Sequence, residues 1–238
     1  MLIGGLQKIS LIDYPGKISC IIFTIGCNFR CPFCHNSQLV LEKKIKQLNH
    51  IKEGEIFDFL KKRKNLLEAV EITGGEPCLQ TDLVSFIKKI KELGYLVKLD
   101  TNGSFPEKLE EIVSQNLVDF IAMDIKSPLT KEKYSKACGI KITDEKLKKI
   151  KRSISIIIKS GVAYEFRTTA VPGLHTKEDI EAIVKYIKGA KKFVIQNFVP
   201  QNCINPEYEK KKSFSVAELN TFKSIAEKFV KTEIRANY

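Results

Sequence analysis

The strongest constraint on the fold of this chain is the alternation of short apolar runs with longer segments of helical spacing. Six runs are rich in β-branched and aromatic residues, and they cover residues 18–24, 69–73, 95–99, 120–125, 163–170 and 193–198. Between the runs, apolar residues such as Leu83, Phe86 and Ile90 recur at three- and four-residue steps with lysines among them. This spacing predicts helices at 53–67, 79–93, 106–115, 144–160 and 177–189.

Strands that alternate with helices predict parallel strands joined by right-handed crossovers. Most runs are apolar on both faces, as strands covered by helices are. Six units are too few for a closed eight-stranded barrel, so we expect an α/β fold with an open sheet or a partial (β/α)6 TIM-like barrel. The 238 residues predict one domain, with an N-terminal extension at 1–17, a core at about 18–200 and a C-terminal helix and tail at 201–238. Helix N-caps are expected at Asp144 and Thr176, and helix C-caps at Gly94 and Gly161.

Polar or glycine-rich clusters follow the expected strands. They occupy residues 26–27, 73–77, 100–103, 124–126, 167–173 and 196–198. The carboxyl ends of parallel strands share one edge of a sheet or barrel, where ligands usually bind. The convergence of five or six such clusters on one rim therefore predicts a functional site there.

Residues 27–35 read CNFRCPFCH and place three cysteines and a histidine within nine residues. The stretch from Cys31 to His35 fits a C-x-x-C-H haem-attachment pattern, although we expect such attachment outside the cytosol and find no obvious second axial ligand. A closed zinc site would use all four side chains, but zinc ligands usually come as two separated pairs and no second pair exists here. Three thiols at C-x3-C-x2-C suit an iron–sulfur cluster that has one iron without a protein ligand.

The cysteine loop resembles the cluster loop of the radical S-adenosylmethionine (SAM) superfamily, in which an aromatic residue, here Phe33, precedes the third cysteine. The sequence GGEP at 74–77 is similar to a second motif of that superfamily. SLIDYPGK at 10–17, DTNG at 100–103, MDIK at 123–126 and VPG at 171–173 resemble the glycyl-radical-enzyme activating enzymes. Pyruvate formate-lyase activase and the anaerobic ribonucleoside-triphosphate reductase activating proteins are the members it resembles most.

The resemblance implies one [4Fe–4S] cluster on Cys27, Cys31 and Cys34, with SAM on the open iron. It implies reductive cleavage of SAM to a 5′-deoxyadenosyl radical, which abstracts a glycine Cα hydrogen in a partner glycyl radical enzyme. A radical SAM enzyme that acts on a small molecule, such as a 7-deazapurine synthase, is the alternative. No catalytic side chain is expected beyond the cluster and SAM. The residues expected to contact SAM are Phe33, Cys34, His35, Gly74, Gly75, Glu76, Asp100, Asn102, Asp124, Ile125, Lys126 and Arg167.

Several of these residues have a more specific expected role. Glycines at 74–75 let the backbone approach a ligand closely because they have no Cβ, and Glu76 can accept from the ammonium group of SAM. Arg167 lies inside a β-run, so it needs SAM or an acidic side chain as its partner. His35 is expected to form a wall of the pocket rather than a fourth ligand. The resemblance also points to a monovalent cation beside Asp100, Thr101 and Asp124.

The chain departs from the pyruvate formate-lyase activase pattern after the last expected strand. A histidine that contacts SAM in that group is absent here, and Gln196 and Asn197 are the expected substitutes. The reductase-activating members are closer at this point. Residues 36–70 contain no cysteine, so the ferredoxin-like insert of some activases is absent. We therefore expect a single cluster and an external one-electron donor, flavodoxin or ferredoxin.

The net charge of +12 comes almost entirely from lysine. These lysines alternate with Glu and Asp in helix-like segments, which favours solvated helix faces over a nucleic-acid-binding surface. The chain has no apolar stretch long enough for a transmembrane helix and no recognisable signal peptide, so we expect a cytoplasmic protein. Seven cysteines in such a protein favour metal ligands, catalytic groups or buried thiols over disulfides.

Overall fold

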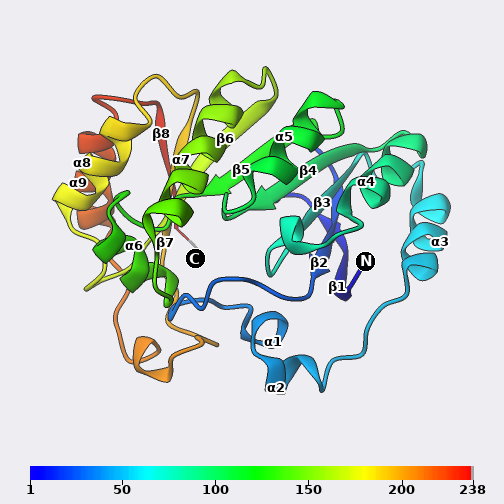
Figure 1. Ribbon diagram of the computed structural model, residues 1–238, viewed down its shortest axis with the longest axis horizontal. Coiled ribbons are helices and arrows are strands. Elements are labelled where there is room, and N and C mark those ends of the chain that lie inside the picture. Colours follow the sequence, from blue (N-terminus) through cyan, green and yellow to red (C-terminus); the bar gives the residue numbers. More distant parts are fainter. Residues whose placement is uncertain (237–238) are drawn as a thin grey trace.

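The computed structural model describes residues 1–236, which form one eight-stranded curved sheet with helices around it (Figure 1). The strand order follows the chain, and only the first pair is antiparallel. The strands are β1 (Ile3–Ser10), β2 (Ser19–Thr24), β3 (Ala69–Gly74), β4 (Leu96–Thr101), β5 (Phe120–Asp124), β6 (Ala163–Ala170), β7 (Phe193–Asn197) and β8 (Thr232–Arg235). Strands β2 to β7 are the six expected from the apolar runs, so the parallel α/β fold is confirmed.

The two edge strands, β1 and β8, were not predicted. β1 lies in the segment expected to be an extension, and it pairs with β2 from Ile3 opposite Thr24 to Ser10 opposite Ser19. β8 lies in the segment expected to be a tail and pairs with β7. Both strands are partly exposed, so neither has the continuous apolar run that marks a buried parallel strand. The six expected strands thus form the centre of the sheet, and β1 and β8 add one strand at each edge.

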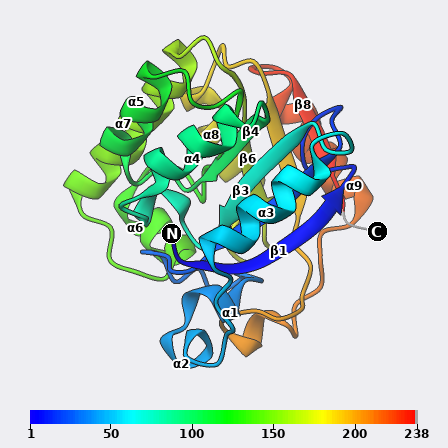
Figure 2. The ribbon, with the colours of Figure 1, turned by 90° about the vertical axis from the view of Figure 1, so that its right-hand side faces the viewer.

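Helices flank the outer side of the curved sheet, whereas α1 and α2 lie at its open side, next to the loop after β2 (Figures 1 and 2). The five predicted helices are present, although the one expected at 79–93 begins only after a 3-10 turn at Pro77–Leu79. The helices are α1 (Ser37–Val40), α2 (Glu42–Ile45), α3 (Glu53–Arg63), α4 (Leu83–Glu92), α5 (Pro106–Ser114), α6 (Lys131–Cys138), α7 (Asp144–Lys159), α8 (Lys177–Tyr186) and α9 (Val216–Ala226), and a second 3-10 turn covers Pro206–Tyr208.

The helix ends agree with the sequence except at α7. Thr176 caps α8 through a hydrogen bond from the Asp179 N–H to its hydroxyl, as expected. The N-cap of α7 is Thr143 rather than Asp144, because the Thr143 hydroxyl accepts the Lys146 N–H and leaves Asp144 as the first helical residue. Gly94 and Gly161 follow α4 and α7 with left-handed φ angles of 83° and 74°, which confirms the two glycine stops.

Alternation along the strands separates two environments. On β3, Val70 and Ile72 are fully buried in the apolar core under the helices, whereas Glu71 and Thr73 point to the concave side and line a cavity. The same alternation holds on β4, where Leu99 belongs to the core and Asp100 lines the cavity. The concave face of the sheet therefore carries polar side chains that end near the carboxyl rim.

Candidate functional site

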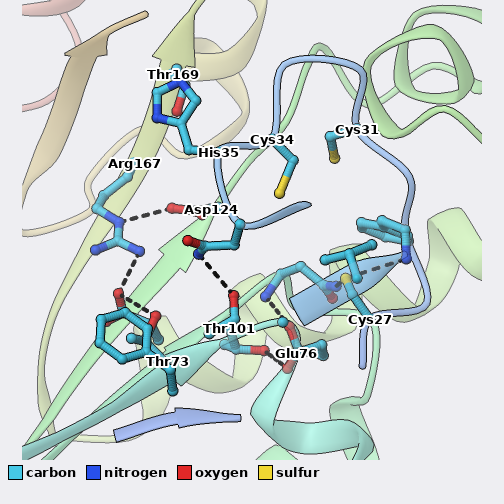
Figure 3. A pocket seen from close by; sticks show the side chains of 18 of the residues that line it. Cys27, Cys31, Cys34, His35, Thr73, Glu76, Thr101, Asp124, Arg167 and Thr169 are labelled. Carbon is cyan, nitrogen blue, oxygen red and sulfur yellow. Dashed lines mark hydrogen bonds and ion pairs between the residues drawn. The ribbon is translucent and has the colours of Figure 1, made fainter. Parts of the chain in front are cut away.

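A cavity of about 470 Å³ lies inside the curve of the sheet at the carboxyl ends of its strands (Figure 3). This volume suits a cofactor or small-molecule site. The walls come from the loop after β2, the turn after β3 and the inward-facing ends of β3 to β7. The predicted site residues that line the cavity are Cys27, Cys31, Phe33, Cys34, His35, Gly74, Gly75, Glu76, Asp100, Asn102, Asp124, Lys126 and Arg167.

Ile125 does not belong to this group. It is fully buried, its N–H donates to the Arg167 carbonyl at 2.8 Å, and its carbonyl accepts the Thr168 hydroxyl at 2.8 Å. Because side chains alternate along an extended segment, Asp124 faces the cavity and Ile125 faces away from it. The structure therefore does not support the expectation that Ile125 contacts SAM.

The cysteine loop runs from the end of β2 to α1 and places all three of its thiols on the cavity side (Figure 3). Arg30 stiffens the loop, because its guanidinium donates to the carbonyls of Cys27 at 2.5 Å and Phe29 at 2.8 Å. The Arg30 N–H also donates to the carbonyl of Cys138 at the end of α6, at 2.8 Å. The loop is thus fixed from outside while its sulfur atoms remain accessible to a ligand.

These thiols fit a [4Fe–4S] cluster. In residues 1–236 no three His, Cys, Asp or Glu side chains are gathered around a point where one metal ion would sit. A cubane cluster does not need such a point, because each thiolate binds a different iron. The remaining cysteines are buried free thiols that do not line the cavity, namely Cys20, Cys78, Cys138 and Cys203. The cavity therefore offers three thiol ligands and leaves one iron of a cubane open.

His35 lies on the cavity wall. Its Nε2 is 2.7 Å from the Val199 carbonyl and its ring lies beside Phe198, so the segment after β7 holds the imidazole. Gln196, at the end of β7, also lines the cavity. Asn197 does not line it, because its amide donates to the Phe214 carbonyl at 2.9 Å. Of the two expected substitutes for the absent histidine, only Gln196 is in position.

The glycine turn after β3 packs directly against the root of the cysteine loop. A Cβ on Gly75 would lie 1.9 Å from the Gly26 carbonyl oxygen. Gly74 has a φ of 115°, and a Cβ there would lie 2.4 Å from the Thr24 nitrogen. Only glycine fits at either position. The two glycines thus let the turn after β3 approach the cysteine loop closely.

Glu76 joins the ends of β3 and β4. Its buried carboxylate accepts the Thr101 hydroxyl and the Asn102 N–H, both at 2.7 Å, and the Cys78 N–H at 3.1 Å. Burial raises the pKa of Glu76 above its ordinary value, although these three donors oppose the rise. A carboxylate offers about four lone-pair sites. One acceptor site therefore remains for an ammonium group.

Asn102 connects the end of β4 to the cysteine loop. Its amide nitrogen donates to Asn28 Oδ1 at 3.0 Å, and its carbonyl oxygen accepts the Ser104 hydroxyl at 2.6 Å. The Asn28 amide closes the ring by donating to Ser104 Oγ at 2.9 Å. Asn28 and Ser104 were not predicted as site residues, because nothing in the sequence pairs two polar loop residues 76 positions apart.

A chain of six alternating charges crosses the concave face. Lys98 lies deepest and is only 2% exposed, with its ammonium 2.9 Å from Glu71 Oε2 and 2.8 Å from Asp100 Oδ1. Glu71 and Lys98 were also missed. Each is the single charged residue in its apolar run and stands two positions before a polar residue at the end of the strand. Because residues two apart share a face of a strand, this position could have indicated that both side chains face the site. The six residues, in order along the chain of contacts, are Glu71, Lys98, Asp100, Arg167, Asp124 and Lys126.

Arg167 forms the centre of this chain. Its Nη2 lies 2.8 Å from Asp100 Oδ2 and its Nε lies 2.8 Å from Asp124 Oδ1, which confirms the expected acidic partner (Figure 3). Lys126 Nζ contacts the second oxygen of Asp124 at 2.8 Å. Burial alone would raise the pKa of Asp124, but Arg167 and Lys126 outweigh it and hold that pKa well below its ordinary value. The carboxylate therefore stays ionised and orients both cations toward the cavity.

Comparison with known proteins identifies relatives of this chain. Residues 21–187 match the radical SAM superfamily. A protein of Methanocaldococcus jannaschii provisionally named a glycyl-radical enzyme activating enzyme is 39% identical over 234 residues, 96% of this chain and 93% of that protein. A second protein of the same organism with the same provisional name is 31% identical over 190 residues, 77% of this chain and 68% of that protein.

Among solved structures, Streptococcus suis SuiB bound to S-adenosylmethionine has a TM-score of 0.66 and 15% sequence identity to this chain. The match covers 92% of this chain but 52% of the SuiB chain, so this chain spans about half the length of SuiB. At this identity the likeness concerns the fold alone. It supports a partial barrel of the kind expected from the alternating strands and helices.

Proposed function

Because this chain belongs to the radical SAM superfamily and, within it, to the glycyl-radical-enzyme activating enzymes, we propose that it generates a glycyl radical in a partner enzyme. One observation carries the proposal. The three thiols of a single loop face the same cavity as the glycine turn, Glu76 and the charge chain around Arg167. Such a cavity can hold a cluster and SAM side by side.

The chemistry that the bound groups would supply is a one-electron cleavage. Cys27, Cys31 and Cys34 would hold a [4Fe–4S] cluster, which when reduced would supply one electron for cleavage of the S–C5′ bond of SAM to methionine and a 5′-deoxyadenosyl radical. Transfer of a hydrogen atom from a glycine Cα would then give 5′-deoxyadenosine and a glycyl radical. Formation of one glycyl radical therefore consumes one SAM molecule and one electron from an external donor.

The side chains of this protein would bind and orient SAM. The backbone at Gly74 and Gly75 and the remaining lone pair of Glu76 are suited to the ammonium group of SAM. Within residues 1–236 Lys126 has one carboxylate contact, so its other N–H groups are suited to the SAM carboxylate. Arg167, fixed between two carboxylates, would present its guanidinium edge to the ligand.

Aromatic side chains would keep water from the radical. Phe29 and Phe33 of the cysteine loop line the cavity and are 2% and 5% exposed. A reactive carbon radical needs such exclusion, because water and solvent protons otherwise open side reactions. His35, on the same loop, would shield the adenine side of SAM through the wall it forms with Phe198.

We further propose a single cluster that is reduced by an external one-electron donor such as flavodoxin or ferredoxin. The support is that residues 36–70 contain no cysteine and that the other four cysteines lie outside the cavity lining. The proposed location is the cytoplasm, which would keep all seven cysteines reduced, as the free thiols are here. No helix in the described part of the chain is long and apolar enough to cross a membrane.

The test of this function uses anaerobically reconstituted protein, dithionite and SAM with candidate glycyl radical enzymes. A glycyl doublet in electron paramagnetic resonance, formed with one candidate and not the others, is the expected result. The matched control is the protein with Cys31→Ala. If 5′-deoxyadenosine accumulates only when a small molecule is added, and no protein radical forms, the small-molecule alternative replaces this proposal.

A further inference from the structure

The monovalent cation expected beside Asp100, Thr101 and Asp124 does not fit this structure. Every carboxylate oxygen that would bind it already lies beside a cationic nitrogen, which would repel a second cation. Asp100 Oδ1 and Oδ2 lie 2.8 Å from Lys98 Nζ and Arg167 Nη2. Both oxygens of Asp124 lie 2.8 Å from cationic nitrogens, and the Thr101 hydroxyl donates to Glu76 and accepts the Gly103 N–H.

We infer that this protein binds SAM without a monovalent cation at that place, because the Lys98 ammonium is the built-in cation of the site. Lys98 is then a positioning residue. It holds Asp100, and Asp100 in turn fixes the guanidinium of Arg167 at the cavity wall. The inference rests on the proposed function only in that SAM occupies the cavity.

The register of the sheet explains why Lys98 can do this. Lys98 is opposite Glu71 in the parallel pair of β4 and β3, and it precedes Asp100 by two residues on the same face. The ammonium therefore meets carboxylates on its own strand and on the neighbouring one. In residues 1–236 no hydrogen-bond donor is aligned on Glu71 Oε2 or Asp100 Oδ1, so the Lys98 charge is what compensates them.

The charge balance leaves no room for a further cation. Three carboxylates, on Glu71, Asp100 and Asp124, face three cations, on Lys98, Arg167 and Lys126, so the fully ionised chain is neutral. Burial and the Asp100 charge raise the pKa of Glu71 to about 8, so near neutral pH the chain carries a charge between zero and plus one. Glu76 is a further carboxylate next to Thr101, but the ammonium group of SAM is its expected partner, so a buried cation beside Asp100 and Asp124 would add positive charge that no carboxylate of this chain of contacts offsets.

The first experiment needs no variant. The dissociation constant of SAM is measured by anaerobic calorimetry on the cluster-loaded protein, in potassium chloride and in choline chloride at equal ionic strength. We expect the two constants to agree within about twofold, well under 1.4 kcal/mol. A saturable requirement for potassium, with binding about tenfold weaker in choline, would overturn the inference.

Two variants test the role of Lys98 itself. Lys98→Ala opens a space beside Asp100, so SAM should bind about tenfold more weakly in choline, and potassium or ammonium should restore much of the loss. Lys98→Met fills that space and should be equally weak in all three salts. The matched control is Lys91→Met, which breaks a 2.7 Å pair with Asp119 outside the cavity and should bind like the natural protein.

Two outcomes of the variant experiment would contradict the inference. Lys98→Ala could bind SAM normally in choline, in which case the ammonium is not needed. Its binding could also stay weak in every salt, in which case Lys98 has only a packing role. If neither variant folds, the comparison of salts on the natural protein decides. Because SAM binding is measured without a partner enzyme, failure to form a glycyl radical would count against the proposed function and not against this inference.

Discussion

The two faces of the same strands differ in what they hold. Ile72 on β3 and Leu99 on β4 are fully buried against the outer helices. Their neighbours Glu71 and Asp100 are almost as buried, yet they carry carboxyl groups that depend on Lys98. Burial of the first pair stabilises the fold, whereas burial of the second costs free energy that the pairing only offsets. Alternate residues of one strand therefore contribute to the stability of the fold and to the site. Mutations one residue apart should differ in how they change the free energy of unfolding and the affinity for SAM.

The largest effect is expected at the cysteine loop. Replacing Cys27, Cys31 or Cys34 by Ala should remove the cluster and abolish reductive SAM cleavage, because each thiolate holds one iron. Iron content and 5′-deoxyadenosine formation measure this. Cys203→Ala, a buried thiol outside the cavity, is the control and should retain both. Full cleavage by Cys34→Ala would show that the ligand set is wrong.

The next effect contrasts the inner face with the outer one. Arg167→Met leaves Asp100 and Asp124 without their shared cation, which should lower the free energy of unfolding by roughly 3–5 kcal/mol and also remove most SAM affinity. Anaerobic guanidinium unfolding and calorimetry measure the two quantities. If the variant is destabilised but binds SAM with normal affinity, Arg167 does not contact SAM.

Ile72→Ala is the matching change on the outer face. Ile72 is fully buried, so its truncation should cost about 2–5 kcal/mol of unfolding free energy through lost burial and a cavity. SAM affinity should hardly change at a temperature where the variant is folded, because the side chain faces away from the site. If Ile72→Ala loses as much SAM affinity as Arg167→Met, the two faces of the strand do not have separate roles.

A smaller, pH-dependent effect should have opposite signs at two carboxylates. The pKa of Asp124 is held low by Arg167 and Lys126 against the effect of burial, so its contribution to stability is present above its ordinary pKa of 3.8 and is lost as pH falls further. The pKa of Glu71 is raised from 4.5 to about 8 by burial and Asp100, so its contribution to stability is fully present below 4.5 and is lost as pH rises from there through 8.

Unfolding free energies of two variants measure these signs. Asp124→Asn should be most costly near pH 7, and its cost should shrink as pH falls below about 4. Glu71→Gln, which mimics the protonated acid, should be nearly neutral below about pH 4.5 and should become progressively more stable than the natural protein as pH rises toward 8. If the free energy of unfolding changes with pH in the same way in both variants, the direction of the pKa shift is wrong for Asp124 or for Glu71.

The smallest effect belongs to the solvated ion pairs of the helices. Arg152 on α7 contacts Glu107 at 2.9 Å and Glu110 at 2.5 Å on α5, and its side chain is 46% exposed. Arg152→Ala should change the unfolding free energy by about 0.5 kcal/mol or less, and salt should reduce even that difference. A loss as large as that of Arg167→Met would contradict the view that burial decides the importance of a charge here.

The sequence predicts this fold well where its pattern is continuous. Strands β2 to β7 follow from apolar runs, because these strands are largely buried and charged residues such as Glu71 and Lys98 interrupt them only at single positions. β1 and β8 were missed because an edge strand is partly exposed and its pattern is weak. The N-cap at Thr143 was misplaced by one residue, since Thr and Asp both cap helices and only the hydrogen bond to Lys146 decides.

Site residues that belong to a contiguous motif could be predicted from the sequence. Contacts that depend on the register between two strands could not. Cys27 to His35 and Gly74 to Glu76 are each a short stretch that carries its own chemistry, so the sequence alone is enough to single them out. The pair of Lys98 with Glu71 depends on which residues stand opposite each other in β3 and β4. Likewise, Ile125 was expected at the site although it does not line the cavity, because a contiguous motif hides the alternation of faces.

The most direct test of the central claim follows the hydrogen atom. The reduced, cluster-loaded protein is mixed with SAM and a glycyl radical enzyme that contains α-deuterated glycine. We predict deuterium in the 5′-deoxyadenosine that forms, and a radical signal whose doublet collapses because the remaining α-hydrogen is deuterium. Formation of 5′-deoxyadenosine without deuterium, and without a protein radical for any candidate enzyme, would contradict the proposal that this cavity activates a glycyl radical enzyme.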